Sequence, residues 1–430
     1  MKRVVLLFLC LLLPLGAARA AVSVRMEDGS LLLGEDGREI VPMGAYSDIV
    51  SLGNGLFAAE TDGLYALMNA RGERLSDMLY SDLRLEDAIL LACRDGLWGL
   101  LSAQGEEIST FDYTHIVSDG QGSFWAVKGD TGDLEADELF LLNSEGAQTA
   151  SGLFVRRLGD ASGDGMLSVL LPETDLWGYC DIRGEMVISA AYSHAGRFIS
   201  GRAAVVKDGR WGAINALGEI IVPAEYDYLE IAEVGFILAA RTGEGAWLMD
   251  MDGATLAFHE GEETFVAPVG NAYILYDGLE LHLCGADGNI LETISREGSV
   301  YEGLNGQWII SDGAWGEECV YLSGTDVMWQ NLYPLGLADG GALYACMQVP
   351  AARVVNDLLG EIQLAVDMES ARYGVVNADG EALIPCEYER VEYLGNGRLL
   401  MVSDGLWQMT DSSGKVYWSY TAKQSEEPSS

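Results

Sequence analysis

The stretch DGRWGAINALGEIIVPAEYD, residues 208–227, decides the fold of this chain. It opens with an Asp-Gly pair, which suits the positive φ angles of a two-residue hairpin turn. Apolar runs flank that pair, Ala203–Lys207 before it and Arg210–Asn215 after it. A second turn near Leu217-Gly218 leads into a third run, Ile220–Val222. Short apolar runs between glycine turns predict antiparallel β-strands.

The same pattern recurs along the whole chain. In the four strongest copies an aromatic residue is followed by Gly and, seven residues after the aromatic, by a closing glycine; these copies begin at Trp98, Trp177, Trp211 and Tyr373. The closing glycines of all the copies are Gly37, Gly72, Gly105, Gly146, Gly184, Gly218, Gly253, Gly288, Gly380 and Gly414. Recurrence at intervals of about 34 residues is typical of a tandem repeat fold.

A tyrosine marks the end of most copies. It follows the closing glycine by eight residues at Tyr80, Tyr113, Tyr192, Tyr226 and Tyr388. Tyr46 follows by nine, and Phe154 takes the equivalent place after Gly146. We expect the residues around this tyrosine to add a short fourth strand to the unit.

One interval departs from the regular spacing. Gly288 and Gly380 are 92 residues apart. We predict that this gap holds one degenerate copy, around Trp315-Gly316 and Gly324, together with an insertion. Within the insertion, the pattern from Val354 to Glu369 suits either a helix or an extended segment.

Several predicted strands are apolar on both faces and therefore need a layer on each side. Stacked repeats supply those layers. We predict an all-β, β-propeller-like fold of tandem, roughly 34-residue antiparallel repeats, with an open superhelical β array as the alternative. Ten or eleven units exceed the usual four to eight blades, so a single ring with one repeat per blade is expected to be strained. Two smaller rings or two repeats per blade remain open.

Residues 208–227 resemble the bacterial WG repeat, which is named after its Trp-Gly pair. The resemblance covers roughly residues 30–420. It is strong in the four copies named above and weak in the copies at Ala246, Leu281 and Trp407. The resemblance implies a β-strand repeat scaffold in a bacterial, often exported protein, and it carries over no catalytic residue.

The two ends of the chain differ from the repeats. Lys2 and Arg3, the apolar run Val4–Leu15 and the small residues of Ala18-Arg19-Ala20 form the pattern of a secretory signal. The apolar run is too short for a membrane span. We predict a signal peptide at 1–20 that is cleaved after Ala20, a repeat array at 21–420, a polar, disordered tail at 421–430, and a secreted or cell-envelope location.

The chain is strongly acidic. Its 66 acidic and 25 basic residues give a net charge of −41, and removal of the three bases of the signal peptide leaves −44. Such a charge repels nucleic acid and anionic lipid, so we expect no nucleic-acid partner and no stable membrane insertion after cleavage. A solvated acidic surface explains the scattered acids, and attraction of Ca²⁺ or a basic partner is the alternative.

No constellation in the sequence amounts to an active site. The six cysteines after the signal peptide show no C-x-x-C spacing and are expected to be buried free thiols: Cys93, Cys180, Cys284, Cys319, Cys346 and Cys386. The four histidines show no metal-binding spacing: His115, His194, His259 and His282. The acidic stretches 130–138 and 160–165 are interpreted as turns. We therefore predict no catalytic, cofactor-binding or metal-binding residue, and no cofactor.

Three functions remain after these exclusions. The first is an exported, non-catalytic scaffold that binds a protein or a cell-envelope glycan, because repeat arrays present long surfaces. The second is a propeller-type hydrolase of wall glycan or peptide that uses carboxylates. The third is a purely structural surface protein. The repeated aromatics are expected to be packing residues. We therefore expect a functional site in segments that depart from the repeat, chiefly 324–373.

Overall fold

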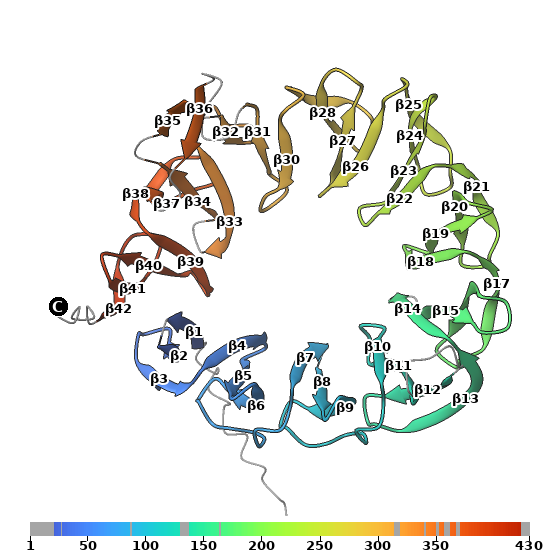
Figure 1. Cartoon of the computed structure of the whole chain (residues 1–430), viewed down its shortest axis with the longest axis horizontal. Helices are drawn as coiled ribbons and strands as arrows, with labels where there is room; N and C mark the ends of the chain where they lie inside the picture. The colour runs from blue at the N-terminus through green and yellow to red at the C-terminus, as the bar shows by residue number, and fades with distance from the viewer. Residues whose placement is uncertain are drawn as a thin grey trace, which may run out of the picture.

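A computed structural model of the chain shows a ring of antiparallel β-sheets (Figure 1). The structure describes residues 21–422, except 27, 87, 130–136, 163–164, 314–318, 339–340, 350–351, 357–361 and 367–369. Within these residues there is no α-helix. Eleven three- or four-stranded sheets stand side by side as blades, and a separate two-stranded hairpin projects from one of them. The fold is a β-propeller.

The first five blades follow the chain from its N-terminal side. Blade 1 holds β1 (Ala21–Met26), β2 (Gly29–Gly34) and β3 (Glu39–Tyr46); blade 2 holds β4 (Asp48–Gly53), β5 (Leu56–Thr61) and β6 (Leu64–Asn69); blade 3 holds β7 (Asp82–Glu86), β8 (Ile89–Arg94) and β9 (Leu97–Ser102); blade 4 holds β10 (His115–Ser118), β11 (Ser123–Val127), β12 (Asp137–Asn143) and β13 (Gln148–Val155); blade 5 holds β14 (Arg157–Ser162), β15 (Met166–Leu171), β16 (Leu176–Asp181) and β17 (Met186–Tyr192).

The other six blades complete the ring. Blade 6 holds β18 (His194–Ile199), β19 (Arg202–Lys207), β20 (Arg210–Asn215) and β21 (Ile220–Tyr226); blade 7 holds β22 (Tyr228–Ala232), β23 (Phe236–Arg241), β24 (Gly245–Met249) and β25 (Thr255–Glu260); blade 8 holds β26 (Phe265–Val269), β27 (Ala272–Tyr276), β28 (Leu281–Gly285) and β29 (Ile290–Ile294); blade 9 holds β30 (Ser299–Glu302), β31 (Trp308–Ser311) and β32 (Val320–Leu322); blade 10 holds β33 (Asn331–Ala338), β34 (Gly341–Gln348), β37 (Arg372–Val376) and β38 (Ala382–Tyr388); blade 11 holds β39 (Arg390–Gly395), β40 (Arg398–Ser403), β41 (Leu406–Thr410) and β42 (Val416–Thr421).

Blade 6 shows how the opening stretch folds. The expected hairpin forms between β19 and β20, and its turn residues Asp208 and Gly209 have φ angles of 53° and 78°. The sequence predicts that the residues around the tyrosine add a fourth strand to the same unit, and this prediction is wrong. Tyr226 ends the outer strand β21, and the chain then enters β22, the innermost strand of the next blade (Figure 1). The blade boundary therefore falls just after the motif tyrosine.

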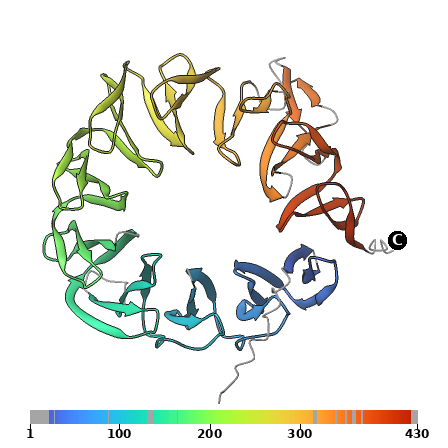
Figure 2. The ribbon, with the colours of Figure 1, turned by 180° about the vertical axis from the view of Figure 1, so that it is seen from behind.

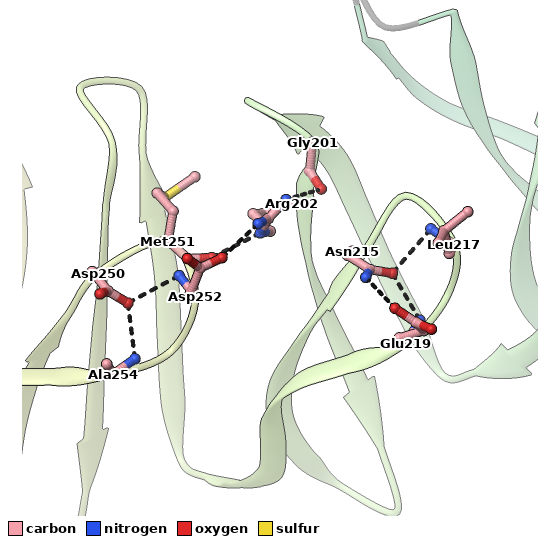
Figure 3. Close-up of polar contacts among 9 residues, drawn as sticks. All are labelled: Gly201, Arg202, Asn215, Leu217, Glu219, Asp250, Met251, Asp252 and Ala254. Atoms are coloured by element: carbon pink, nitrogen blue, oxygen red, sulfur yellow. Dashed lines mark hydrogen bonds and ion pairs between the residues drawn. The ribbon is translucent and has the colours of Figure 1, made fainter.

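Every blade contains the turn that the closing glycine forms. All eleven of these glycines, with Gly324 as the eleventh, have φ between 72° and 84°, which is the left-handed region that glycine tolerates best. In blade 6 the Gly218 N–H donates to the Asn215 carbonyl at 2.9 Å. The Asn215 side-chain oxygen accepts from the N–H groups of Leu217 and Glu219 at 3.0 and 2.9 Å (Figure 3). Asp250 caps the turn of blade 7 in the same way.

In most blades the closing glycine also lies against the blade before it. A Cβ at Gly253 of blade 7 would lie 2.8 Å from the carbonyl oxygen of Ile221 on β21. A Cβ at Gly146 of blade 4 would lie 2.0 Å from the carbonyl oxygen of Ile108, in the blade 3 segment after β9. Both contacts are too short for any side chain, so the turn demands glycine for packing as well as for its backbone angle.

A polar contact also joins neighbouring blades, and here a side chain of the earlier blade donates to the turn of the later one. Arg202, which begins β19 of blade 6, donates to the Met251 carbonyl at 2.7 Å and to the Asp252 carboxylate at 2.9 Å (Figure 3). Met251 lies two residues before the closing glycine of blade 7. In blade 9, Gln307 donates to the equivalent carbonyl of blade 10, that of Ala378, at 2.8 Å.

The ring closes with this same interface. Arg398 of blade 11 donates to the carbonyl of Glu35, two residues before the closing glycine of blade 1, at 3.1 Å. A Cβ at Gly37 would lie 2.0 Å from the Tyr417 carbonyl oxygen on β42. Buried side chains of blades 1 and 11 form one core, which includes Leu33 and Met409. The view from behind also places the first and last blades side by side (Figure 2).

The expectation that a single ring of one repeat per blade is strained is therefore wrong. Blade number depends on the angle between neighbouring blades, and here the closure between blades 11 and 1 repeats the contacts found elsewhere in the ring. The open array is excluded for the same reason.

The 92-residue interval contains the predicted degenerate unit and an insertion. Blade 9 is the degenerate copy, with its turn at Gly324 (φ 79°), whereas Trp315 and Gly316 lie outside the described residues. The insertion follows β34 and contains a hairpin of β35 (Ala352–Asn356) and β36 (Ile362–Val366). Of the two alternatives for this segment, the described part is extended rather than helical.

Substitution of Gly37 tests the ring closure. Both Gly37→Ala and Gly63→Ala place a side chain in the left-handed region, which costs about 1 kcal/mol. Only at Gly37 does the new Cβ meet a backbone oxygen, whereas nothing lies within 4 Å at Gly63. We expect Gly37→Ala to lower the free energy of unfolding by at least about 2 kcal/mol more than Gly63→Ala in urea denaturation. Equal losses would contradict a closed ring.

Substitution of Arg202 tests the polar contact between blades. Arg202→Met keeps the apolar stem and removes the donors to Met251 and Asp252, so we expect a loss of about 1–2 kcal/mol in the free energy of unfolding. Arg183→Met is the matched control, because Arg183 is 69% exposed and pairs with acids of its own turn. The control is expected to lose less than about 0.5 kcal/mol. Chemical denaturation of both variants measures the difference.

Candidate functional site

The repeated aromatics are packing residues, as their recurrence predicts. Each motif aromatic lies opposite the motif tyrosine of its own blade on the neighbouring strand: Trp177 with Tyr192, Trp211 with Tyr226 and Tyr373 with Tyr388. Isolated bridges place Trp98 opposite Tyr113 and Tyr65 opposite Tyr80. The motif tyrosines Tyr113 and Tyr80 are at most 2% exposed. Paired aromatics of this kind stabilise a blade by about 0.5–1.5 kcal/mol beyond their burial.

Phe154 is an exception to this pattern. It is 49% exposed, and the following residue, Val155, is buried in the core between blades 4 and 5. The expectation that Phe154 replaces the tyrosine is therefore wrong, because the strand register places Val155 on the core side.

The glycine of the Trp-Gly pair has a structural role. A Cβ at Gly212 would lie 2.7 Å from the Val222 carbonyl oxygen and 2.8 Å from the Ala224 nitrogen. The ladder between β20 and β21 shifts register at this point, between Trp211 and Ala213. The outer strand bulges over the glycine, so this glycine supports the blade.

A hollow with a volume of about 880 Å³ lies along the inner side of blades 5 to 9. We call it the inner groove. Its wall combines the innermost strands β18 and β22 with the turns that follow β22, β26 and β30. Those inner strands face the centre of the ring (Figure 1). Among the described side chains, the groove brings together Arg197, Trp211, Tyr228, Glu230, Glu302 and Trp308.

The inner groove is acidic. Its described lining contains four carboxylates, those of Asp160, Glu230, Glu233 and Glu302, and one guanidinium, that of Arg197. Arg197 of blade 6 forms an ion pair with Glu233 of blade 7, which leaves three carboxylates in excess. A groove with one sign of charge concentrates ligands of the opposite charge.

Aromatic side chains accompany these carboxylates. The Tyr228 hydroxyl donates to the Glu230 carboxylate. Burial, and then the hydrogen bond and negative charge of Glu230, raise the pKa of Tyr228 above its usual value, so the phenol stays neutral. The Trp308 indole N–H donates to the Val269 carbonyl at 3.2 Å, which fixes this ring between blades 8 and 9. Carboxylates beside aromatic rings suit cationic groups.

A second hollow extends the groove toward blade 3. Its volume is about 550 Å³, and it is lined by inner-strand residues that include Arg84, Glu86 and His115. Asp160 and Arg197 line both hollows, so the two lie next to each other along the inner side of blades 3 to 9. Burial, together with the positive charge of Arg84, lowers the pKa of His115 and keeps its imidazole neutral at pH 7.

The histidines do not form a common site. His115 and His194 lie at the start of the inner strands β10 and β18. His259 lies 3.2 Å from the Tyr273 hydroxyl. His282 is buried in blade 8, where its two nitrogens contact the Thr293 hydroxyl at 3.0 Å and the Asp277 carboxylate at 3.2 Å.

The contacts of His282 place an acid, an imidazole and a hydroxyl in the order of a catalytic triad. None of the three residues lines the inner groove. The Asp277 carboxylate also accepts from the N–H groups of Leu279 and Glu280, both at 2.9 Å. The arrangement therefore ties the turn after β27 to β28 and β29, which is a structural role.

No metal centre is visible in the described residues, since no three histidine, cysteine, aspartate or glutamate side chains gather closely enough to bind an ion. Most of the acidic stretch 130–138 lies outside the described residues, and so do residues 163–164 of the second stretch. The described part of the chain also contains no helical segment with the length and hydrophobicity of a membrane span. The predicted signal peptide 1–20 and residues 423–430 are outside the description.

The inner groove lies in another part of the chain than the segment 324–373, where a functional site is expected from the sequence. The inner groove lies in blades 5 to 9, and the segment 324–373 contributes no residue to it. A signal was present in the turns after the first strand of each unit. Blades 8 and 9 have Gly270-Asn271 and Asn305-Gly306-Gln307 there, although blades 2 and 11 have similar turns at Asn54-Gly55 and Asn396-Gly397.

Removal of the Asp277 carboxylate tests its structural role through pH. Backbone hydrogen bonds from Glu280 and Leu279, and the contact with His282, lower the pKa of Asp277 to about 2. A lowered pKa stabilises the fold above the unfolded value of about 3.9, and that stabilisation is lost as the pH falls through about 2. We expect Asp277→Asn to lower the Tm at pH 7 and the difference to vanish near pH 2. Thermal unfolding of wild type, Asp277→Asn and the exposed control Asp379→Asn measures it.

Comparison with known protein structures gives only distant similarities. An eukaryotic initiation factor is 10% identical, with a TM-score of 0.40 over 86% of this chain and 96% of that chain. BamB from Moraxella catarrhalis is 12% identical, with a TM-score of 0.30 over 67% of this chain and 90% of the other. The Dos1 propeller is 8% identical, with a TM-score of 0.30 over 60% and 86%. A comparison with curated proteins gives no match.

Comparison with protein families identifies one family in three segments of the chain. The profile of the family described as WG containing repeat matches residues 177–211, 211–237 and 373–407. These segments contain three of the four strong copies, with Trp177, Trp211 and Tyr373 as their aromatics. Their strands belong to consecutive blades 5 to 7 and to blades 10 and 11. The chain therefore contains WG repeats in these segments, and their strands form part of a β-propeller.

Proposed function

We propose that this protein is a non-catalytic binding scaffold whose inner groove holds an extended, positively charged segment of another protein. The observation that carries the proposal is the excess of carboxylates beside Trp211, Tyr228 and Trp308 in one continuous hollow. Lysine and arginine side chains pair with carboxylates and also lie favourably over aromatic rings.

The shape of the groove favours an extended ligand. It crosses the inner strands of several blades, and its two hollows share Asp160 and Arg197. Residues from blades 3 to 9 are therefore available to one chain that runs along the ring. A compact cofactor would instead be expected in an enclosed pocket within one or two blades.

The negative net charge of the whole chain also favours a positively charged partner. A net charge of −41 attracts basic proteins over distance and speeds their encounter at low salt. We place this binding outside the bacterial membrane, because the N-terminal twenty residues have the composition of a secretory signal.

Replacement of two groove carboxylates tests the proposal. The probe is a ten-residue peptide of alternating Lys and Ala, whose binding to the full chain is followed by isothermal titration calorimetry at low and physiological salt. We expect Glu230→Gln with Glu302→Gln to weaken binding at least tenfold, because two carboxylates of the acidic wall are neutralised. The matched control, Glu106→Gln with Asp379→Asn, removes the same charge from exposed outer turns and should weaken binding less than twofold.

Three outcomes would overturn the proposal. Equal weakening by both double variants would show that the peptide binds the acidic surface in general. Binding of soluble wall-glycan fragments, but not of the peptide, would identify a glycan scaffold. Release of products from wall glycan or peptide, abolished by a single carboxylate substitution, would identify a hydrolase.

A further inference from the structure

Two cysteines meet in blade 10. Cys346 is fully buried on β34, and Cys386 is half-buried on β38. Their Sγ atoms are 3.2 Å apart, and the Cys386 Sγ also lies 3.7 Å from the Cys346 carbonyl oxygen. Both side chains belong to the core between blades 9 and 10. Forty residues separate them in the sequence, so the repeat spacing alone does not reveal this contact.

The contact depends on the glycine of the repeat motif. Strand β37 lies between β34 and β38, and Cys346 is in register with Gly374 on that middle strand. A Cβ at Gly374 would lie 2.4 Å from the Ile384 carbonyl oxygen and 2.8 Å from the Cys386 nitrogen. The outer strand bulges here, so Cys386 lies over the glycine and reaches Cys346 across it.

Other cysteines of the described chain are placed differently. Cys180 and Cys284 are buried in separate cores, and burial raises their pKa values to about 12 and about 11. Cys93 is buried in blade 3. Cys319 packs at the edge of the core that holds the pair, so it is the alternative partner that an experiment must separate.

We propose that Cys346 and Cys386 are a redox-active pair that forms an intrachain disulfide when the protein meets a small-molecule disulfide such as oxidised glutathione. The expectation that all the cysteines remain free thiols would then hold only under reducing conditions. The two sulfur atoms need to approach by about 1 Å to reach bonding distance.

The chemistry of the pair suits this reaction. The two sulfur atoms are within hydrogen-bonding distance, and this contact lowers the pKa of Cys386 and raises that of Cys346. Cys386 is also the more exposed of the two. It is therefore the thiolate that attacks an incoming disulfide, because the thiolate is the nucleophile in exchange.

The exchange proceeds in two balanced steps. The Cys386 thiolate bonds to one sulfur of oxidised glutathione, and the other glutathione leaves as a thiolate. Cys346 then loses its proton to solvent and attacks the Cys386 sulfur, which expels the second glutathione. The protein loses two thiols, and one oxidised glutathione becomes two reduced ones.

A disulfide between Cys346 and Cys386 would cross-link the strands next to the insertion. It joins β34 to β38 across β37, and the loop that it closes contains the β35–β36 hairpin. A cross-link across such a loop stabilises a fold mainly by restricting its unfolded chain. The blade that carries the insertion would thus be held by a covalent bond in addition to its regular packing.

The experiment oxidises the full chain with glutathione buffers of increasing oxidised fraction. Free thiols are alkylated, and the digested protein is analysed by mass spectrometry without reduction. We expect a loss of two thiols, a peptide pair linked through Cys346 and Cys386, and a Tm that is higher by roughly 2–6 °C than that of the reduced protein. Cys386→Ser should retain its remaining thiols and show no such Tm shift.

Two further variants make the result decisive. Cys93→Ser is the matched control and should still lose two thiols, because Cys93 lies in another blade. Cys346→Ala with Cys386→Ala tests the pair if the single serine variant folds poorly, and it should be insensitive to the buffer. No loss of thiols in the wild type, or a linkage through Cys319, would overturn the proposal.

Discussion

The close contact between most of the closing glycines and the blade before them is the constraint on which the rest of the structure depends. It sets the separation of neighbouring blades, because the turn backbone lies against the outer segment of the previous blade, as at Gly146 and Gly253. The Asn, Asp or Ser that caps the turn holds the glycine in place, as Asn215 does in blade 6. Repetition of one interface of fixed angle yields a ring, and Gly37 makes the last contact against Tyr417.

This constraint also decides where the molecule is free to vary. The motif aromatic, its glycine and the tyrosine are all used within or between blades, as Trp211, Gly212 and Tyr226 show. The innermost strand and the turn after it contribute less to that interface, so they can differ from blade to blade. The inner groove uses this freedom, since residues such as Glu230, Asn271 and Glu302 share no repeat position. The cysteine pair arises in the same way, because Gly374 leaves room that two non-repeated side chains occupy.

Several features were predictable from local sequence and others were not. The Asp208-Gly209 hairpin and the packing role of Trp211 follow from turn chemistry and recurrence, and both are confirmed. The assignment of Tyr226 was wrong because a repeat in the sequence and a blade in space begin at different residues. Phe154 was misassigned because a shift of one residue reverses the face of a strand, which no spacing argument detects. The groove was missed because its residues come from distant units that only the ring brings together.

By itself, the sequence determined that this chain is a tandem β-repeat that contains WG repeats, with glycine turns and aromatic pairs at regular intervals. Those features depend on contacts within one unit or between neighbours, which are local in the chain. Only the tertiary structure decided that eleven blades close into one ring, that an acidic groove runs along its inner side, and that Cys346 meets Cys386. The angle between blades accumulates around the whole ring, and that sum is not encoded at any single position.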